Sequence, residues 1–474
     1  MCRPSSSRVI PLTTFTCWGQ LPTELKHHVL RLLGDDKDIT SAVRRNYILV
    51  CETWQHWFEV GNFEHLVING TGADFNNLTR IVTWNPRRQS TVKKLSFRVC
   101  LRTQTKASMY GGKQHMQRCL TMTEMFTTLL DCLKNWTREP HEEGLVLEIH
   151  VKSEEESRPI WNALVFQEHI RYCPEVPIVT TLTLRGHYRQ CLSYSSVSHL
   201  LQHSFPNLQR LQMEKVVSTL IVGGKGQEED DLPSDLVQAF PDTLRIWSFV
   251  HDQPYYRHDE AGENLTMPID KPQPLPFEKL RALESIVFFH TIDASRFFRS
   301  TKTTSQTTMT WPNLKVLSLN STAIGCKNGD HRRAILTAAA KAVKHMPQIQ
   351  RFELWGISPS ADIGACFKYS RSCSYRIAHV VMAVTEPTPA NYDLTAENIW
   401  AGEVEKAWEW VAYAHEAELK LDFTNGLRVF SPRYEKGDDG AGAKREDFLF
   451  VSSVMRHLEY ARRREGTKGW GEAI

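Results

Sequence analysis

Few residues in this chain have the types and spacing that enzyme or metal chemistry requires. Cys366 and Cys373 are separated by six residues, but no Cys or His pair follows that would complete a tetrahedral zinc site. The run Gly223–Gly226 lacks the residue order of a phosphate-binding loop, and the four acids after it would repel phosphate. No serine-hydrolase, zinc-protease or dinucleotide motif occurs. We therefore expect no enzyme activity, with no catalytic residue, no metal site and no cofactor.

The composition argues against nucleic acid and membrane as partners. The chain has 474 residues, and its 57 basic and 54 acidic side chains are well mixed and leave a net charge of only +3. Residues 1–17 contain no continuous apolar run, and no stretch of 18 apolar residues occurs anywhere. The eleven cysteines show no paired spacing, as in proteins of a reducing compartment. These features predict a soluble protein of the cytoplasm, the nucleus or both.

The segment from Leu21 to Trp57 has the pattern of a helical docking module. Pro22 suits the first turn of a helix, and one apolar face is predicted for that helix from Leu25, Val29, Leu32 and Leu33. Residues 34–38 interrupt the pattern, and Asp38 or Thr40 is expected to cap a second helix. The apolar stripe of the second helix is expected at Val43, Tyr47, Val50, Cys51, Trp54 and Phe58. Two short helices cannot bury all of this apolar surface, so another chain or the next domain is expected to cover it.

This segment resembles the F-box, a short helical motif with a Leu-Pro opening and a Val-Cys-x-x-Trp ending. Leu21 and Val50 are 50 − 21 = 29 positions apart, which is longer than the usual spacing, so the middle helix is expected to be extended or displaced. The resemblance implies binding to a Skp-type adaptor and, through it, to a cullin-RING ubiquitin ligase. The residues that it assigns to adaptor binding are Leu21, Pro22, Glu24, Leu25, Val29, Leu30, Leu33, Val50, Cys51 and Trp54. An ordinary helical hairpin that caps a repeat is the alternative.

Five segments in the middle of the chain share one template. They begin at Phe205, Phe240, Phe277, Trp311 and Met346, and their starts are 35, 37, 34 and 35 residues apart. A fixed period of this length is typical of repeat architectures. Each segment ends in alternating apolar residues that predict a strand with one buried face: Leu208, Leu211 and Met213; Leu244, Trp247 and Phe249; Leu283, Ile286 and Phe288; Leu314, Leu317 and Leu319; and Ile349, Phe352 and Leu354.

The same alternation occurs earlier, at Phe63–Ile68, Val92–Phe97, Leu145–Ile149 and Val179–Leu184. Helices are expected between strands at Met122–Trp136, Tyr194–His203 and Arg332–His345. A unit of strand plus helix resembles an irregular leucine-rich repeat, which presents one strand face to partners. A twisted α/β layer fits the same pattern. The positions at which a target could bind are the variable ones, such as Gln212, Glu214, Ser248, His251, Ser318 and Asn320.

The last third of the chain resembles a fungal domain of uncharacterised function that is found behind F-boxes. The residues that carry the resemblance are Glu353 to Gly356; Ala365, Phe367 and Tyr369; and Ala407, Trp408, Val411 and Ala412. The spacing of Val404, Ala407, Trp408 and Val411 predicts an amphipathic helix with Trp408 in the core. Residues 425–474 match no part of that family.

These observations predict an α/β chain in which a helical F-box precedes an irregular leucine-rich-repeat-like solenoid of strands and helices. The expected divisions are a disordered tail at 1–17, the F-box-like domain at 18–60, the solenoid at 61–356, the C-terminal part of the repeat-associated domain at 357–430, and a flexible loop with a terminal helix at 431–474. The expected function is that of a substrate receptor, which presents an unknown protein target to the ligase. The alternative is a leucine-rich-repeat-like protein-binding scaffold with no ligase role.

Overall fold

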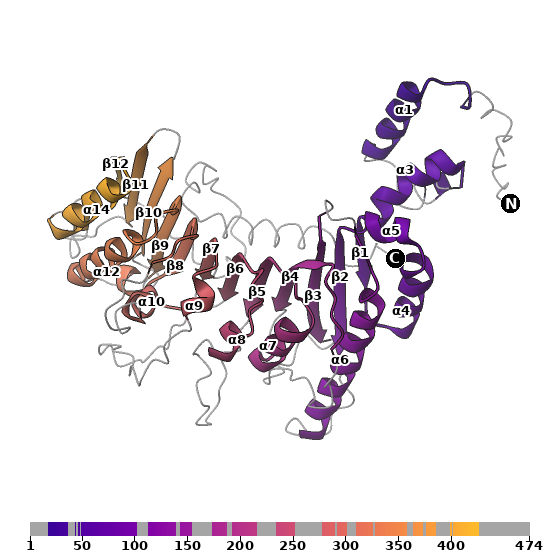
Figure 1. The fold of residues 1–474 in the computed structure, drawn as a ribbon, viewed down its shortest axis with the longest axis horizontal. Helices are drawn as coiled ribbons and strands as arrows, with labels where there is room; N and C mark the ends of the chain where they lie inside the picture. The colour runs from indigo at the N-terminus through magenta and orange to yellow at the C-terminus, as the bar shows by residue number, and fades with distance from the viewer. Residues whose placement is uncertain are drawn as a thin grey trace, which may run out of the picture.

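The structure is a computed structural model that describes most of the chain between residues 18 and 425 (Figure 1). The described residues are 18–36, 43, 46–47, 49–101, 112–138, 143–153, 173–186, 192–215, 234–251, 277–289, 292–300, 310–325, 328–357, 364–372, 376–384, 399–400 and 402–425. The expected tail at 1–17, the caps at Asp38 and Thr40, and the segment 431–474 lie outside them.

The described strands form one sheet of twelve strands in the order in which they occur in the chain. The strands are β1 (His65–Ile68), β2 (Lys94–Leu101), β3 (Leu145–Ser153), β4 (Val179–Gly186), β5 (Arg210–Lys215), β6 (Ile246–His251), β7 (Ser285–Phe289), β8 (Val316–Asn320), β9 (Arg351–Ile357), β10 (Gly364–Ser372), β11 (Ile377–Val384) and β12 (Glu418–Asn425). Strands β1 to β9 are parallel. Strand β10 is antiparallel to both of its neighbours, whereas β11 and β12 are again parallel. The prediction of a mixed α/β chain is therefore confirmed.

Helices lie along one side of this sheet and at its two ends (Figure 1). Along the side lie α6 (Gly112–Leu133), α7 (Tyr194–His203), α8 (Ser234–Gln238), α9 (Phe277–Leu280), α10 (Ala294–Ser300), α11 (Thr322–Gly325) and α12 (Gly329–Val343). Near β1 lie α1 (Thr23–Asp35), α3 (Glu52–Phe63), α4 (Gly72–Leu78), the π-helix η2 (Thr79–Thr83) and α5 (Pro86–Thr91), and at the other end lies α14 (Glu403–Ala414). None of the described helices is long and apolar enough to cross a membrane.

Alternation along the strands creates the main core, because every second side chain points toward the helices. The buried strand residues include Leu211, Trp247, Ile286 and Leu317, and they pack in one cluster with helix residues such as Leu200. The strands predicted from this alternation are confirmed. The three predicted helices are also present, and α6 begins ten residues earlier than the expected Met122.

A backbone ladder repeats just before successive strands. The amide of Arg245 donates to the carbonyl of Gln209 at 2.8 Å, and that of Glu284 donates to Arg245 at 2.7 Å. The amide of Lys315 donates to Glu284 at 2.7 Å, and that of Gln350 donates to Lys315 at 2.8 Å. These five residues hold equivalent places in the five repeats of the sequence. The period of the sequence is thus a period of backbone hydrogen bonding.

The sheet and its core continue through residue 356, where a domain division was expected. Strand β9 crosses that position and pairs with β10, and Phe367 of β10 lies in the same core as Phe352 of β9. Helix α14 covers these strands, and Trp408 is buried with its ring centroid 4.6 Å from that of Phe367. The predicted core role of Trp408 is confirmed.

The N-terminal helices differ from prediction in two respects. Cys51 has an extended backbone and precedes α3, so the helix expected to run through Val43 and Phe58 is interrupted by a turn at residues 49–50. On α1, Leu30 is the buried leucine, whereas Leu25 and Leu32 are exposed. The predicted apolar face of α1 was therefore wrong in part. Leu30 is the leucine that packs against Trp54 and Phe58 of α3.

Candidate protein-binding surfaces

The N-terminal helices have a small core of their own, separate from the core of the sheet. Leu30, Trp54 and Phe58 are buried in it, and Trp18, Leu33, Tyr47 and Cys51 pack around them. The ring of Trp54 meets the rings of Trp18 and Tyr47 edge-on, with centroids 5.1 and 5.4 Å away. Aromatic contacts of this geometry add stability beyond the apolar area that they bury. The two helices are therefore held as one module.

Apolar side chains also cover the outside of this N-terminal module. Leu25 of α1 is 51 % exposed, and in the turn before α3 Leu49 is 80 % and Val50 is 40 % exposed. The other exposed apolar residues of the module are Leu32, Val43, Trp57 and Val60. Single exposed apolar residues are ordinary on protein surfaces, but a group on so small a module is typical of a protein-binding site.

The ten residues assigned to adaptor binding fall into three groups by exposure. Leu30 and Trp54 are buried, and Leu21, Val29, Leu33 and Cys51 are half-buried. Pro22, Glu24, Leu25 and Val50 are exposed. Direct contact with a partner is therefore available to the exposed group, while Leu30, Leu33, Cys51 and Trp54 hold the module together. The exposed Leu49 was not among the ten, although it directly precedes Val50.

A partly buried ion pair joins the N-terminal module to α5, the helix that precedes β2. Glu59 of α3 accepts from the guanidinium of Arg88 of α5 at 2.5 Å and from the side-chain amide of Gln55 at 2.9 Å. Arg88 also donates to the carbonyl of Ile81 at 3.2 Å and lies over the ring of Phe63. These contacts fix α3 against the helices that lead into β2.

The face of the sheet opposite the main core carries a row of polar residues in register. We call this set the polar row: Ser96, Glu148, Thr183, Gln212, Ser248, Ser318, Glu353 and Lys368. Val287 fills the one apolar place in it, between Ser248 and Ser318. Three of the variable positions chosen from the sequence, Gln212, Ser248 and Ser318, therefore share one line across the sheet. Glu214 and Asn320 lie two residues further along their strands, and His251 ends β6.

Glu148 is the centre of a charged cluster in the polar row. Its Oε2 accepts from the Ser96 hydroxyl at 2.8 Å and lies 2.7 Å from the Lys94 ammonium and 3.3 Å from Nε2 of His150. Its Oε1 accepts from Nε of Arg185. Burial by itself raises the pKa of Glu148, but the contact with His150 and the charges of Arg185 and Lys94 outweigh it and hold that pKa far below its ordinary value. These partners therefore favour the charged carboxylate of Glu148 at neutral pH.

His65 extends this cluster onto β1. Its Nε2 lies 2.8 Å from the Ser96 hydroxyl, which in turn donates to Glu148. Burial, together with the nearby charge of Lys94, lowers the pKa of His65. The second ring nitrogen of a neutral His65 can therefore form a further hydrogen bond next to the cluster, in which Lys94 and Arg185 neutralise the charge of Glu148. This arrangement suits recognition of polar groups, and among the described residues no cluster of His, Cys, Asp and Glu could hold a metal ion.

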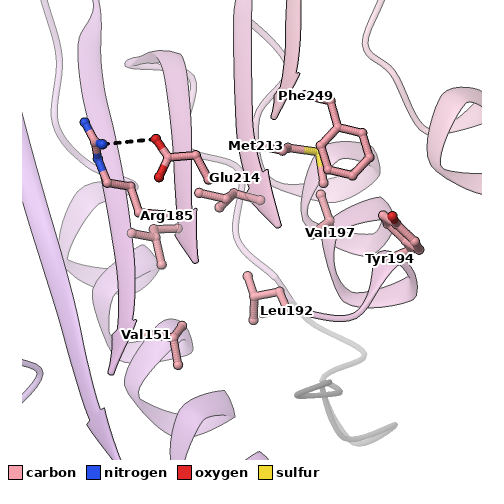
Figure 2. A pocket seen from close by; sticks show the side chains of 10 residues that line it. Val151, Arg185, Leu192, Tyr194, Val197, Met213, Glu214 and Phe249 are labelled. Atoms are coloured by element: carbon pink, nitrogen blue, oxygen red, sulfur yellow. Dashed lines mark hydrogen bonds and ion pairs between the residues drawn. The ribbon is translucent and has the colours of Figure 1, made fainter. Parts of the chain in front are cut away.

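A small recess lies where β3 to β6 end beside α7. Figure 2 shows its apolar wall, formed by Val151, Leu192, Val197, Met213 and Phe249 among others, with Tyr194 at the start of α7. The dashed line in Figure 2 is the ion pair between Arg185 and Glu214, at 3.0 Å, on the rim of the recess. The cavity volume of about 30 Å³ leaves room for only a few water molecules. It is too small for a cofactor or a typical small-molecule substrate.

Sequence reasoning missed the residues around Glu148. Lys94, Glu148 and Arg185 lie on three strands, and nothing in their local sequence indicates that they meet. The signal that was present is the alternation, because Glu148 stands between the buried Leu147 and Ile149. That pattern places Glu148 on the polar face, while its neighbours are defined only by the strand register.

Comparison with known protein families gives a match to the second half of the chain. A model of a family of unknown function, DUF6546, matches residues 242–436, which is less than half of the chain. The matched part begins just before β6 and includes β6 to β12 and α14. No curated protein and no solved structure matches the chain. The region from β6 onward is thus similar to a family whose function is not known.

Proposed function

We propose that this protein is an F-box substrate receptor, which binds a Skp-type adaptor through its N-terminal module and presents a protein target to a cullin-RING ubiquitin ligase. The observation that carries the proposal is the exposure of Leu25, Leu49 and Val50 on a module that already has its own core. The motif resemblance at Leu21–Trp54 supports the identity of the partner. Catalysis would belong to the recruited ligase.

The exposed apolar residues are suited to act as anchors of an interface. A few apolar residues that become desolvated at the centre of an interface usually carry most of its binding energy. Leu25 and Val50 belong both to the motif and to the exposed set, so they are the proposed anchors. Leu30 and Trp54 would act indirectly, since their burial maintains the shape of the module.

The strand region is proposed to be a leucine-rich-repeat-like solenoid that holds the target. Its strands follow in chain order, and the backbone ladder repeats with the sequence period. Repeat proteins of this kind use one continuous face for binding. The proposed target surface lies on the face of the sheet that carries the polar row. Gln212, Ser248 and Lys368 are half-buried there, whereas Ser96, Glu148, Thr183, Ser318 and Glu353 are buried and would shape this face from below. A place of action in the cytoplasm or nucleus follows from the proposed partners.

The test is co-purification of the tagged full-length protein with a purified Skp-type adaptor. Changing Leu25→Glu together with Val50→Glu places two charges on the proposed interface without touching the buried core. We expect this variant to lose adaptor capture while its circular dichroism stays that of the unchanged protein. The control is Met116→Glu on α6, because Met116 is an equally exposed apolar residue outside the module.

Adaptor capture that is equal in all three proteins would remove the F-box assignment. The protein would then be better described as a repeat scaffold that binds its partner without a ligase. A second readout separates the two functions: the half-life of a bound partner in cells lengthens on proteasome inhibition only if the protein serves a ligase.

A further inference from the structure

Strand β12 leaves one backbone edge open among the described residues. It is the last strand in the order of the sheet and pairs in parallel with β11. The amide of Glu418 donates to the carbonyl of Arg376 at 2.8 Å, so residue 418 directs its backbone groups toward β11. Successive residues of a strand direct these groups to opposite edges. Leu419, Leu421 and Phe423 therefore direct their N–H and C=O groups away from the sheet.

The side chains at this edge are also accessible. Leu421 is 41 % exposed, although it follows the same alternation as the half-buried Leu419 and Phe423. On the other face of the strand, Glu418 and Lys420 are exposed. An edge of this length with an exposed apolar residue is a template on which another strand can pair.

We propose that β12 is a homodimer interface, in which the β12 strands of two copies pair antiparallel about a two-fold axis at Leu421. In this register Leu421 faces itself, and Leu419 faces Phe423 of the second copy. The three outward-directed residues of each copy then form pairs that exchange two hydrogen bonds each, as in an ordinary antiparallel ladder.

Charge selects this register among those that symmetry allows. With the axis at Leu421, Lys420 faces Asp422 of the second copy, and this happens twice. With the axis at Lys420, two lysines would face each other, and Glu418 would face Asp422. An axis at Leu419 or Phe423 would leave much of one end of the strand unpaired, since β12 extends only from Glu418 to Asn425.

The self-complementarity of the strand is the reason for choosing a second copy as the partner. Closed symmetric dimers require a patch that matches itself, with residue i facing j and residue j facing i. The sequence Glu-Leu-Lys-Leu-Asp-Phe meets this requirement at the Leu421 axis, because Lys420 then faces Asp422 and Leu419 faces Phe423 of the second copy. Cross-strand pairs of opposite charge stabilise antiparallel strands, and like charges destabilise them.

The experiment is sedimentation velocity of the full-length protein over a wide concentration range. We expect a reversible dimer for the unchanged chain. Each of Lys420→Glu and Asp422→Lys creates two like-charge pairs and should raise the dimer dissociation constant about tenfold. An equimolar mixture of the two variants restores opposite charges at both positions, so it should form a heterodimer as readily as the unchanged chain dimerises.

Two further variants test the geometry. Leu421→Pro removes an N–H that points to the open edge and none that β11 uses, so it should abolish the dimer while the monomer keeps its circular dichroism. Glu418→Lys reverses a charge on the same face opposite the neutral Thr424, and it should leave the dimer intact. A monomer at every concentration, or a dimer that is unaffected by both charge reversals, would overturn the proposal.

Discussion

The carboxylate of Glu59 and the guanidinium of Arg88 lie 2.5 Å apart and connect the N-terminal module to the sheet. The side chain of Glu59 is only 7 % exposed and that of Arg88 is 24 % exposed. Because α3 and α5 meet at this pair, it sets the orientation of the proposed adaptor-binding module relative to the proposed target surface. The pair is therefore a sensitive point for both stability and function.

Changing Glu59→Ala should destabilise the junction by about 2 kcal/mol, because it leaves a largely buried guanidinium without its carboxylate. Hydrogen exchange in the α3 peptides, followed by mass spectrometry, measures the loss. Glu64→Ala is the matched control, since Glu64 forms a 3.0 Å pair with Lys93 in which both side chains are half-exposed or more. That change should cost much less than the loss of Glu59, because solvent screens an exposed ion pair. Equal effects of the two changes would contradict the structural role of the junction.

Changing Glu148→Gln should weaken folding at neutral pH by about 2–3 kcal/mol, because Lys94 and Arg185 lose the carboxylate between them. The pKa of Glu148 is lowered in the folded state, so the carboxylate contributes stability above the ordinary pKa of 4.5 and loses it progressively as the pH falls below that value. The difference in urea midpoint between the two proteins should therefore narrow in acid. A difference that is constant from pH 7 to pH 3 would show that Glu148 is not the ionised centre of the cluster.

Changing His415→Gln should make the free energy of unfolding depend less on pH between pH 6.5 and pH 4. Burial, assisted by the charge of Arg371, lowers the pKa of His415 to about 4, while the same group in the unfolded chain has its ordinary value of 6.5. Between these values the unfolded state binds a proton that the folded state does not, so stability falls as the pH is lowered from 6.5 to 4. Urea midpoints across this range should fall less steeply in the variant. Parallel curves would contradict the assignment.

Changing Gly70→Ala should destabilise the protein by about 1–2 kcal/mol, the usual cost of a left-handed backbone for a residue with a Cβ. Gly70 has φ of +68°, and an added Cβ would lie 3.2 Å from both Met125 Sδ and Phe97 Cε2. Gly61→Ala is the control, because Gly61 lies in α3 and an added Cβ there meets nothing within 4 Å. Thermal unfolding should show a loss for the first and a small gain for the second.

The strands and their buried faces could be predicted from the sequence because both follow from a period of two. Leu317 and Leu319, for example, are buried as their alternation indicates. Helix α7 was also predicted with its exact limits, since Ser193 precedes it and its side chain caps the amide of Ser196. Local pattern is sufficient in these cases because the signal and the structure lie in the same few residues.

Other features depend on contacts between distant residues. The apolar spacing continues unbroken through Cys51, so it could not reveal the extended backbone there. Leu30 and Leu32 are equally apolar, and only the position of Trp54 decides which one is buried. The partners of Glu148 lie 54 residues before it and 37 residues after it, so their meeting follows from strand register. The antiparallel pairing of β10 with β9 likewise could not be predicted from its sequence. Adaptor binding remains a prediction from the motif.

The order of the sheet has a consequence for how the chain can be built during synthesis. Among the described strands, each strand from β2 to β12 pairs with the strand that comes immediately before it in the sequence. Each strand that leaves the ribosome therefore finds its first partner already made, and no strand has to wait for a distant C-terminal segment. The N-terminal module, with its separate core, can precede all of them. We thus expect the growing chain to acquire structure in the direction of translation, one strand at a time.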